Sequence, residues 1–418
     1  MVHRSFRYDR DFLIGYFAGY FVIAYILMPL YYRMNLTSIY TYLENRFGKS
    51  AYKTGASFFI LSRVIGASIR LFLVANVLQL FVFSRWNVPF EVTVVISILL
   101  IWLYTYRGGI KTIIWTDTLQ TLSMLTAVGV TIYYITTSLS PDEGVVSLIS
   151  KSDYSDMFNF KDIKGRGHFI KQFIGGMLIT ITMTGMDQDM MQKNLSCKNI
   201  KDAQKNMISF SVILIFVNLL FLALGALMFI YSHEQGLDLP EKADNVYPFI
   251  ALDGNLPLIV GILFLLGLLS AAYSSADSAL TSLTTSVCVD IIGLKKIEEK
   301  KRMAIRKRVH VIMCIILLIS IIIFNYFTEK SALMELLQLA TYTYGPLLGM
   351  FMFGIFTSYS VKDSAIPFIC ILSPILSYFI TTYSQQLLFG YQFGFELLLV
   401  NGGLTFLGLF LLREGSSQ

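Results

Sequence analysis

Residues 270–290 read SAAYSSADSALTSLTTSVCVD, a run of hydroxyl side chains and carboxylates in an otherwise leucine-rich segment. Positions 271, 274, 275 and 278 follow the i, i+3, i+4, i+7 spacing that places residues on one face of a helix. The oxygen donors there are the Ala271 carbonyl, Ser274, Ser275 and Ser278, with Asp277 beside them. Hard cations prefer several oxygen ligands, so this face predicts a cation site. Back-bonding of serines to helix carbonyls is the alternative, and it does not account for the carboxylate.

The surrounding sequence is that of an integral membrane protein. Of its 418 residues, 55% are hydrophobic and 14% are charged, against about 25% charged in soluble domains. The apolar residues form runs of about twenty, the length that crosses a hydrocarbon core. The net charge of +6 resides mostly in short loops between these runs, so it does not predict nucleic-acid binding. Four cysteines show no spacing typical of a metal site or a disulfide framework.

Eleven membrane spans are expected, at 11–32, 54–83, 89–106, 111–138, 169–188, 206–232, 256–286, 309–327, 332–357, 364–383 and 394–412. Lys and Arg are concentrated in alternate loops, which the positive-inside rule places in the cytoplasm. The N-terminus is then outside and the C-terminus inside. An external N-terminus carrying Arg4, Arg7 and Arg10 is unusual, and it indicates that upstream spans are absent from this chain.

Helix-breaking residues interrupt two of these spans. Gly175-Gly176 and Thr184-Gly185 lie in the fifth, and Gly345-Pro346 lies in the ninth. Transporters place ion and substrate groups at broken helices. The alternative is close helix packing, as expected for Gly15 and Gly19 of the first span.

Charged residues inside the spans are the next candidates for function. Asp117 lies in an apolar helix, where an acid faces the bundle interior or a water-filled path by default. The alternative is that Asp117 lies at the level of the lipid headgroups. Arg63 and Arg70 are close to two turns apart and point the same way. They either face a substrate path and bind a carboxylate, or pair with an internal acid such as Asp117.

Asp187, Gln188 and Asp189 follow the fifth span. They form either a cytoplasmic gate or a cap on the helix end, and an acid at a helix C-terminus needs a further role because it opposes the helix dipole. The sequence contains no catalytic triad, zinc-protease motif or nucleotide-binding loop, so we do not expect an enzyme.

Five stretches resemble motifs of the sodium:solute symporter family and occur in the family's order. They are YYRMNLTSIYTYLENRFG (31–48), RGGIKTIIWTDTLQ (107–120), MTGMDQDMMQ (183–192), SAAYSSADSALTSL (270–283) and TYTYGPLLG (341–349). The resemblance covers nearly the whole chain. It implies an all-α membrane protein with the LeuT-type fold of two inverted five-helix repeats and about 11 transmembrane helices.

The resemblance also implies how the chain is divided. We expect a single transporter domain over 1–418, with the remainder of the first repeat at 11–138, the second repeat at 169–357 and two trailing spans at 364–412. The family's first two N-terminal spans have no counterpart here. The implied protein is therefore N-terminally truncated and not competent for transport alone.

Site residues follow from the matching motifs. The resemblance assigns Ala271, Ser274 and Ser275 to the sodium site common to the family. It assigns Asp117, Ser274 and Ser278 to a second sodium site found in some members, where Asp277 replaces a hydroxyl residue. The implied substrate-binding candidates are Arg63, Arg70, Thr182, Met183, Gln338 and Tyr342, and the gating candidates are Asp187 and Gln188.

The expected function is sodium-coupled symport of a small organic solute, with an acidic sugar or another carboxylate favoured over a neutral sugar. A sensor module built on a symporter-like domain is the alternative. The expected partners are sodium, the solute and the lipid bilayer, with no nucleic acid and no obligatory protein partner. A multi-pass location in the bacterial inner membrane is expected.

Overall fold

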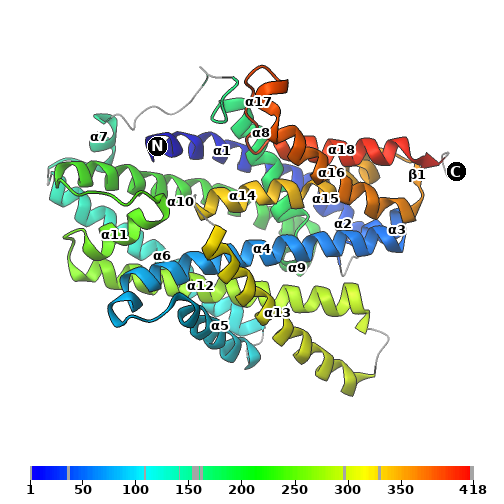
Figure 1. Cartoon of the computed structure of the whole chain (residues 1–418), viewed down its shortest axis with the longest axis horizontal. Coiled ribbons are helices and arrows are strands. Elements are labelled where there is room, and N and C mark those ends of the chain that lie inside the picture. Colours follow the sequence, from blue (N-terminus) through cyan, green and yellow to red (C-terminus); the bar gives the residue numbers. More distant parts are fainter. Residues whose placement is uncertain are drawn as a thin grey trace.

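Long helices running roughly along one axis make up the protein (Figure 1). The computed structural model describes residues 2–34, 38–107, 110–140, 142–152, 160, 163–294, 298–327 and 331–414. Among these, seven helices are long and apolar enough to cross a membrane, and two further spans are bent helix pairs. Two shorter apolar helices, Phe90–Leu103 and Leu397–Leu411, lie at the two remaining expected positions. The prediction of an all-α membrane protein is confirmed.

The first half of the chain contains α1 (Val2–Val22), α2 (Met28–Arg33), α3 (Thr41–Arg46), α4 (Lys49–Phe81), α5 (Phe90–Arg107), α6 (Ile110–Leu139), α7 (Val145–Ser150), α8 (Phe169–Thr180), α9 (Gln188–Leu195) and α10 (Ile200–Glu234). The second half contains α11 (Val246–Asp253), α12 (Leu258–Ser286), α13 (Glu299–Phe327), α14 (Ala332–Thr343), α15 (Gly345–Phe356), α16 (Ile366–Thr382), α17 (Ser384–Leu387) and α18 (Leu397–Leu411). Two short strands, β1 (Ser360–Val361) and β2 (Arg413–Glu414), pair antiparallel. Turns of π-helix extend α1 to Leu27, α8 to Gly185 and α12 to Ile292.

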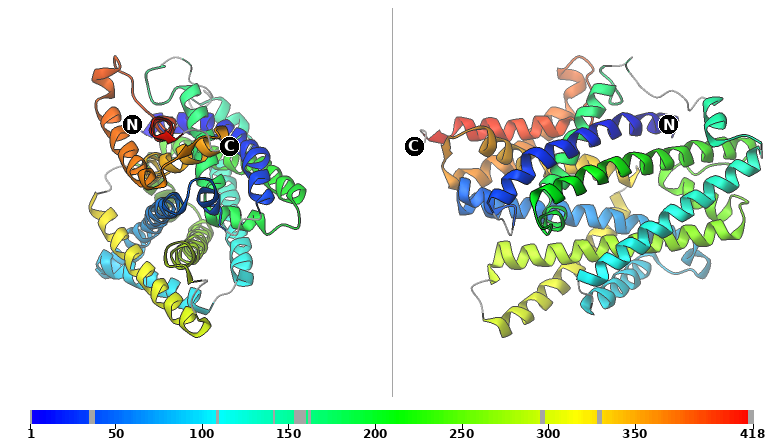
Figure 2. Two further views of the ribbon diagram at one scale, coloured as in Figure 1. Left: turned by 90° about the vertical axis from the view of Figure 1, so that its right-hand side faces the viewer. Right: turned by 180° about the vertical axis from the view of Figure 1, so that it is seen from behind.

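Helix α1 packs closely on α8 through small residues, and it also runs beside α10 (Figure 2). A Cβ at Gly19 would lie 2.7 Å from the Cβ of Thr180, and one at Gly15 would meet the carbonyl of Phe173. One at Gly176 would meet the Phe12 carbonyl in the same interface. The packing role expected for Gly15 and Gly19 is confirmed.

Gly175-Gly176 do not interrupt their span, contrary to expectation. Helix α8 runs through both positions without a break. Gly175 lies against Phe395, where a Cβ would be 2.7 Å from the Cβ of that residue, and Gly176 lies against α1. Close approach of neighbouring backbones is therefore the physical reason for both glycines.

The breaks fall where Thr184-Gly185 and Gly345-Pro346 predict them. The segment ending at Gly185 and α9 are bent by 66°, and α14 and α15 are bent by 43°. Pro346 lies in the first turn of α15, where its missing N–H group leaves no helix bond unmade. Both broken spans lie between residues 169 and 357, the range expected for the second repeat.

Hydrogen bonds hold the helix bundle together at the end that carries the C-terminus. The Asp363 carboxylate accepts hydrogen bonds from the backbone N–H groups of Ser50 and Ala51 at 2.8 and 2.9 Å, and so caps the start of α4. Arg46 donates to the carbonyls of Thr357 and Tyr359 at 2.9 and 2.8 Å, just beyond the end of α15. These contacts hold α4 and α15 in fixed relation around the broken spans.

Candidate transport site

The break between α8 and α9 leaves backbone carbonyls without helix partners, and tyrosines satisfy them. The Tyr31 hydroxyl donates to the carbonyl of Gly185 at 2.9 Å, and the Tyr40 hydroxyl donates to that of Met186 at 2.9 Å. Both tyrosines are fully buried. Irregular backbone at membrane depth is tolerated where other protein groups form hydrogen bonds with it, so these two tyrosines stabilise the break.

Asp187 begins the helix that follows the break. Its carboxylate accepts hydrogen bonds from the backbone N–H groups of Asp189 and Met190 at 3.0 and 3.2 Å, which makes it the N-cap of α9. The sequence analysis placed Asp187 at a helix C-terminus, where an acid is unfavourable. That assignment was wrong, because the chain turns and starts a new helix at Gln188, and an acid at a helix N-terminus is favourable.

Arg63 of α4 pairs with the acids at this break. Its guanidinium lies 2.6 Å from the Asp189 carboxylate and 3.5 Å from that of Asp187. Arg63 is 6% exposed and Asp187 is 0% exposed. The Tyr344 hydroxyl, at the second helix break, approaches the Asp187 carboxylate to 3.4 Å. Of the two roles considered for Arg63, the structure gives pairing with internal acids, here Asp187 and Asp189.

Gln188 links the break to another segment. Its side-chain oxygen accepts a hydrogen bond from the backbone N–H of Ile39 at 2.8 Å, and its side chain is buried. Gln188 and Asp187 therefore tie the start of α9 to the chain before α3 and to α4.

Arg70 has a different environment from Arg63, although the two share one side of α4. Its guanidinium and the Leu336 side chain of α14 both lie against Gly66. Within the described part of the chain, no carboxylate forms an ion pair with Arg70, which is half-buried. A charged, bidentate donor is therefore present between α4 and α14 without an acid from the described residues bound to it.

The predicted cation-binding face lies on α12, which packs against α4, α6 and α9. Ser274, Asp277 and Ser278 are buried, while Ala271 and Ser275 are half-buried. The Lys193 ammonium of α9 donates to the Ser278 hydroxyl at 3.3 Å and lies 4.0 Å from the Asp189 carboxylate. This oxygen-rich face thus adjoins the break that Arg63 and Asp187 define.

Asp117 is the expected second carboxylate of the cation site, and its side chain is not among those that the structure describes. Its backbone belongs to α6, which packs along α12. The role of Asp117 stays a prediction.

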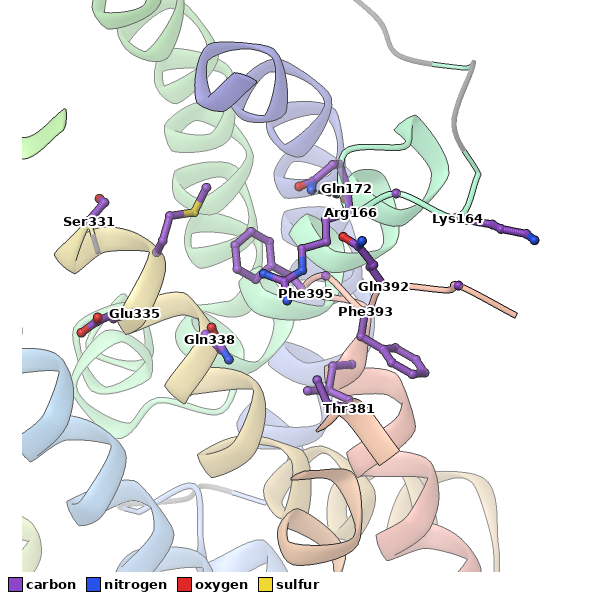
Figure 3. A pocket seen from close by; sticks show the side chains of 15 residues that line it. Lys164, Arg166, Gln172, Ser331, Glu335, Gln338, Thr381, Gln392, Phe393 and Phe395 are labelled. Atoms are coloured by element: carbon purple, nitrogen blue, oxygen red, sulfur yellow. Dashed lines mark hydrogen bonds between the residues drawn. The ribbon is translucent and has the colours of Figure 1, made fainter. Parts of the chain in front are cut away.

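The other substrate-binding candidates lie on the two broken spans. The buried Thr182 hydroxyl donates to the Leu178 carbonyl at 2.9 Å within its own helix, and Met183 is half-buried. Gln338 is exposed and lines a cavity, and Tyr342 one turn later is half-buried. The structure thus places Gln338 on the cavity side of α14 (Figure 3) and Tyr342 near Tyr378 of α16, with ring centroids 6.4 Å apart, while Thr182 is engaged by its own backbone.

Three residues that contribute to the site were not predicted from the sequence. Tyr31 and Tyr40 lie in the 31–48 stretch, whose tyrosine spacing does not indicate which carbonyls they contact. Lys193 falls among several loop lysines, so its position beside Ser278 could not be distinguished from that of its neighbours.

Broken helices with charged and hydroxyl groups at their interruptions define the class of membrane secondary transporters. The model of the sodium:solute symporter family matches residues 10–366. The sodium/sialic acid symporter NanT of Aliivibrio fischeri is 26% identical over 87% of this chain and 73% of its own length. SiaT of Proteus mirabilis, another sodium/sialic acid symporter, is 24% identical over 92% of this chain and 78% of its own.

A solved structure gives the same fold. The substrate-bound, outward-open state of a Na+-coupled sialic acid symporter superposes with a TM-score of 0.78 at 20% identity, covering 97% of this chain and 85% of that one. The chain belongs to the sodium:solute symporter family, with the LeuT-type fold. It is a multi-pass membrane transporter, not an enzyme, and sodium is its coupling ion.

Proposed function

We propose that this symporter carries a carboxylate-bearing solute, such as an acidic sugar, and that Arg70 binds its carboxylate. The observation that carries the proposal is the difference between two arginines on one helix. Arg63 is held by Asp187 and Asp189, whereas Arg70 forms no ion pair within the described part of the chain. A guanidinium binds a carboxylate through two parallel hydrogen bonds, which gives both affinity and orientation. That NanT and SiaT are sodium/sialic acid symporters supports this choice of solute.

Sodium binds, in this proposal, at the oxygen-rich face of α12. Ala271, Ser274 and Ser275 provide ligands to the first ion. Ser278, Asp277 and Asp117 belong to a second site shared with Ser274, and burial of Ser274, Asp277 and Ser278 supports a shielded cation position. A carboxylate beside these hydroxyls strengthens binding of a hard cation because it adds charge and oxygen ligands.

Asp187 and Gln188 act, in this proposal, as gate residues. Asp187 contacts Arg63 of α4, and Gln188 contacts the Ile39 backbone, so both contacts must break before α9 can move away from α4 and from the segment before α3. The protein lies, in this proposal, in the inner membrane of a bacterium, with this end of the break toward the cytoplasm and the N-terminus outside. The positive-inside rule supports that orientation.

Uptake by the full-length protein in proteoliposomes tests the choice of solute. Matched acidic and neutral sugars are compared as competitors of labelled sialic acid, for the wild type and for Arg70→Lys. We expect competition by acidic sugars only, and at least about a tenfold loss of sialic acid uptake in Arg70→Lys, because lysine cannot form the bidentate contact. A clear preference for neutral sugars, or an unaffected Arg70→Lys variant, contradicts the proposal.

A further inference from the structure

A cavity of about 360 Å³ lies between α4, α5 and α12, which pack against one another (Figure 1). Its lining on α4 runs from Leu71 to Val82, and Phe83 in the turn after α4 also lines it. The α12 wall runs from Leu265 to Ala272. The cavity shares no residue with the candidate transport site, and its volume lies within the usual range for binding sites.

The lining of this cavity is almost wholly apolar. Ser97 is the only polar residue among the described residues that line it. Its hydroxyl donates to the Thr93 carbonyl at 2.8 Å within α5, so it is already satisfied. Apolar cavities stay dry, and an empty one forfeits the dispersion contacts of its walls. An apolar occupant would therefore stabilise this part of the bundle.

The cavity opens toward the surface that faces lipid. Ile96 is 42% exposed and Leu100 is 45% exposed, although both line the cavity. Helix α5 also exposes Val92, Val95 and Leu99. Since the chain is a multi-pass membrane protein, the medium at such an apolar face is the hydrocarbon of the bilayer. A lipid chain can therefore enter the cavity from the side.

The length of the cavity corresponds to one leaflet of a bilayer. Leu71 and Val82 are eleven residues apart on α4, which is about 16 Å along the helix axis. The hydrocarbon core of a bilayer is about 30 Å thick, so each leaflet contributes about 15 Å. One acyl chain of a single leaflet thus has the length that the cavity requires.

The end of the cavity beyond Val82 carries groups suited to a phospholipid headgroup. Arg85 and Trp86 lie in the turn that begins at Phe83, and both are exposed. Arg85 forms no ion pair with any described residue, and its guanidinium fork suits a phosphate. The Trp86 ring lies 6.0 Å from the Phe83 ring, and tryptophan is enriched at the membrane–water interface. Glu91 lies nearby at the start of α5, so a phosphate group is matched here, not a net negative charge.

Gln79 holds this end of the cavity in a fixed arrangement. Its side-chain nitrogen donates to the Val88 carbonyl at 2.6 Å, and its side-chain oxygen accepts a hydrogen bond from the Thr93 hydroxyl at 2.6 Å. These bonds join the end of α4 to the start of α5 across the turn that contains Arg85. The opening is therefore preorganised before any lipid binds.

We propose that this cavity binds one acyl chain of an outer-leaflet phospholipid, whose phosphate is bound by Arg85. The orientation proposed above places the turn with Arg85 on the outer side of the membrane. Ala272 lines the cavity and directly follows Ala271, so the bound chain supports α12 beside its oxygen-rich face. The site does not depend on the identity of the solute or on the role of Arg70.

Photocrosslinking tests the site. The protein is reconstituted in liposomes of phosphatidylethanolamine and phosphatidylglycerol with a trace of phosphatidylethanolamine that carries a diazirine in one acyl chain. Labelled peptides should contain mainly residues 71–83, 96–101 and 265–272. Val74→Phe fills the cavity and should lower this labelling at least about tenfold. Val95→Phe is the matched control, because Val95 is 46% exposed on α5 and does not line the cavity.

Two further variants and a second measurement complete the test. Leu269→Phe fills the cavity from α12 and should act like Val74→Phe. Arg85→Gln should lower labelling by the phospholipid about threefold, without changing labelling by a diazirine fatty alcohol that lacks a phosphate. In detergent micelles, added phosphatidylethanolamine should raise the melting temperature of the wild type and Val95→Phe but not of Val74→Phe, because a ligand stabilises the folded state that binds it.

Each other outcome overturns part or all of the proposal. Labelling spread evenly over the lipid-facing helices means annular lipid only, and it overturns the site. Undiminished labelling in both Val74→Phe and Leu269→Phe does so as well, as does an equal rise in melting temperature for Val74→Phe and Val95→Phe. Equal losses of phospholipid and fatty alcohol labelling in Arg85→Gln, or no loss of either, overturn binding of the phosphate by Arg85.

Discussion

Replacing Arg63 with methionine should destabilise the protein, whereas the same change at Arg70 should leave its stability nearly unchanged. Both arginines lie on one side of α4, but among the described residues only Arg63 has an ion-pair partner, at 2.6 Å from Asp189 and 3.5 Å from Asp187. Without Arg63, the carboxylate of Asp187 stays fully buried and loses its ion-pair partner. Methionine retains most of the apolar stem but removes the guanidinium, with its charge and its N–H donors, in both variants alike.

The size of the effect follows from the contacts of Asp187. Removing one partner of a buried ion pair costs about 3–5 kcal/mol, because the other charge remains buried. Asp187 keeps two backbone N–H donors, at 3.0 and 3.2 Å, which compensate for part of this cost. We therefore expect about 3 kcal/mol for Arg63→Met, at the lower end of that range. For Arg70→Met, which leaves behind no ion-pair partner among the described residues, we expect less than about 1 kcal/mol.

Reversible unfolding in mixed detergent micelles measures both variants. Adding Asp187→Asn to Arg63→Met should recover about half of the loss, because asparagine keeps the cap and removes the charge. Equal destabilisation by Arg63→Met and Arg70→Met would refute the distinction between the two arginines. Absence of any recovery in the double variant would show that Asp187 is not the group left unpaired.

Three further predictions concern packing, sodium and helix capping. Gly19→Leu should lower the free energy of unfolding by about 1–3 kcal/mol in the same assay, because a Cβ at this position of the α1–α8 contact lies 2.7 Å from Thr180. Gly403→Leu is the control, because a Cβ at Gly403 meets nothing within 4 Å. Ser274→Ala should raise the sodium concentration for half-maximal uptake, and an unchanged sodium dependence would remove it from the ion site. Asp363→Ala should lower the free energy of unfolding by about 1–2 kcal/mol, because α4 loses its cap, and an unchanged value would show that water replaces the carboxylate.

Local sequence chemistry accounts for much of the fold. The length of the apolar runs predicts the spans, and Gly345-Pro346 predicts a break because proline cannot continue a helix hydrogen-bond ladder. Gly175-Gly176 looked equally disruptive, yet α8 is continuous there. The difference lies in Phe12 and Phe395, which approach these glycines from elsewhere in the chain. The spacing of residues in the sequence does not predict such contacts between distant segments.

The candidate site, like the fold, could be predicted from the sequence only in part. Helical periodicity alone brings Ser274, Asp277 and Ser278 onto one buried region of α12. The partners of Arg63 could not be identified in the same way, because Asp187 and Asp189 approach it only after the chain bends by 66°. The cavity near the start of α8 could not be predicted for a similar reason, because its walls include two loops joined by Lys171.

Sodium-driven accumulation tests the central claim most directly. The full-length protein is reconstituted in proteoliposomes, and labelled sialic acid inside is measured under an inward sodium gradient or an equal potassium gradient. We predict accumulation above the external concentration with sodium only, and none with Arg70→Met under either gradient. Equal accumulation with potassium would contradict sodium coupling, and undiminished accumulation by Arg70→Met would contradict recognition of the carboxylate by Arg70.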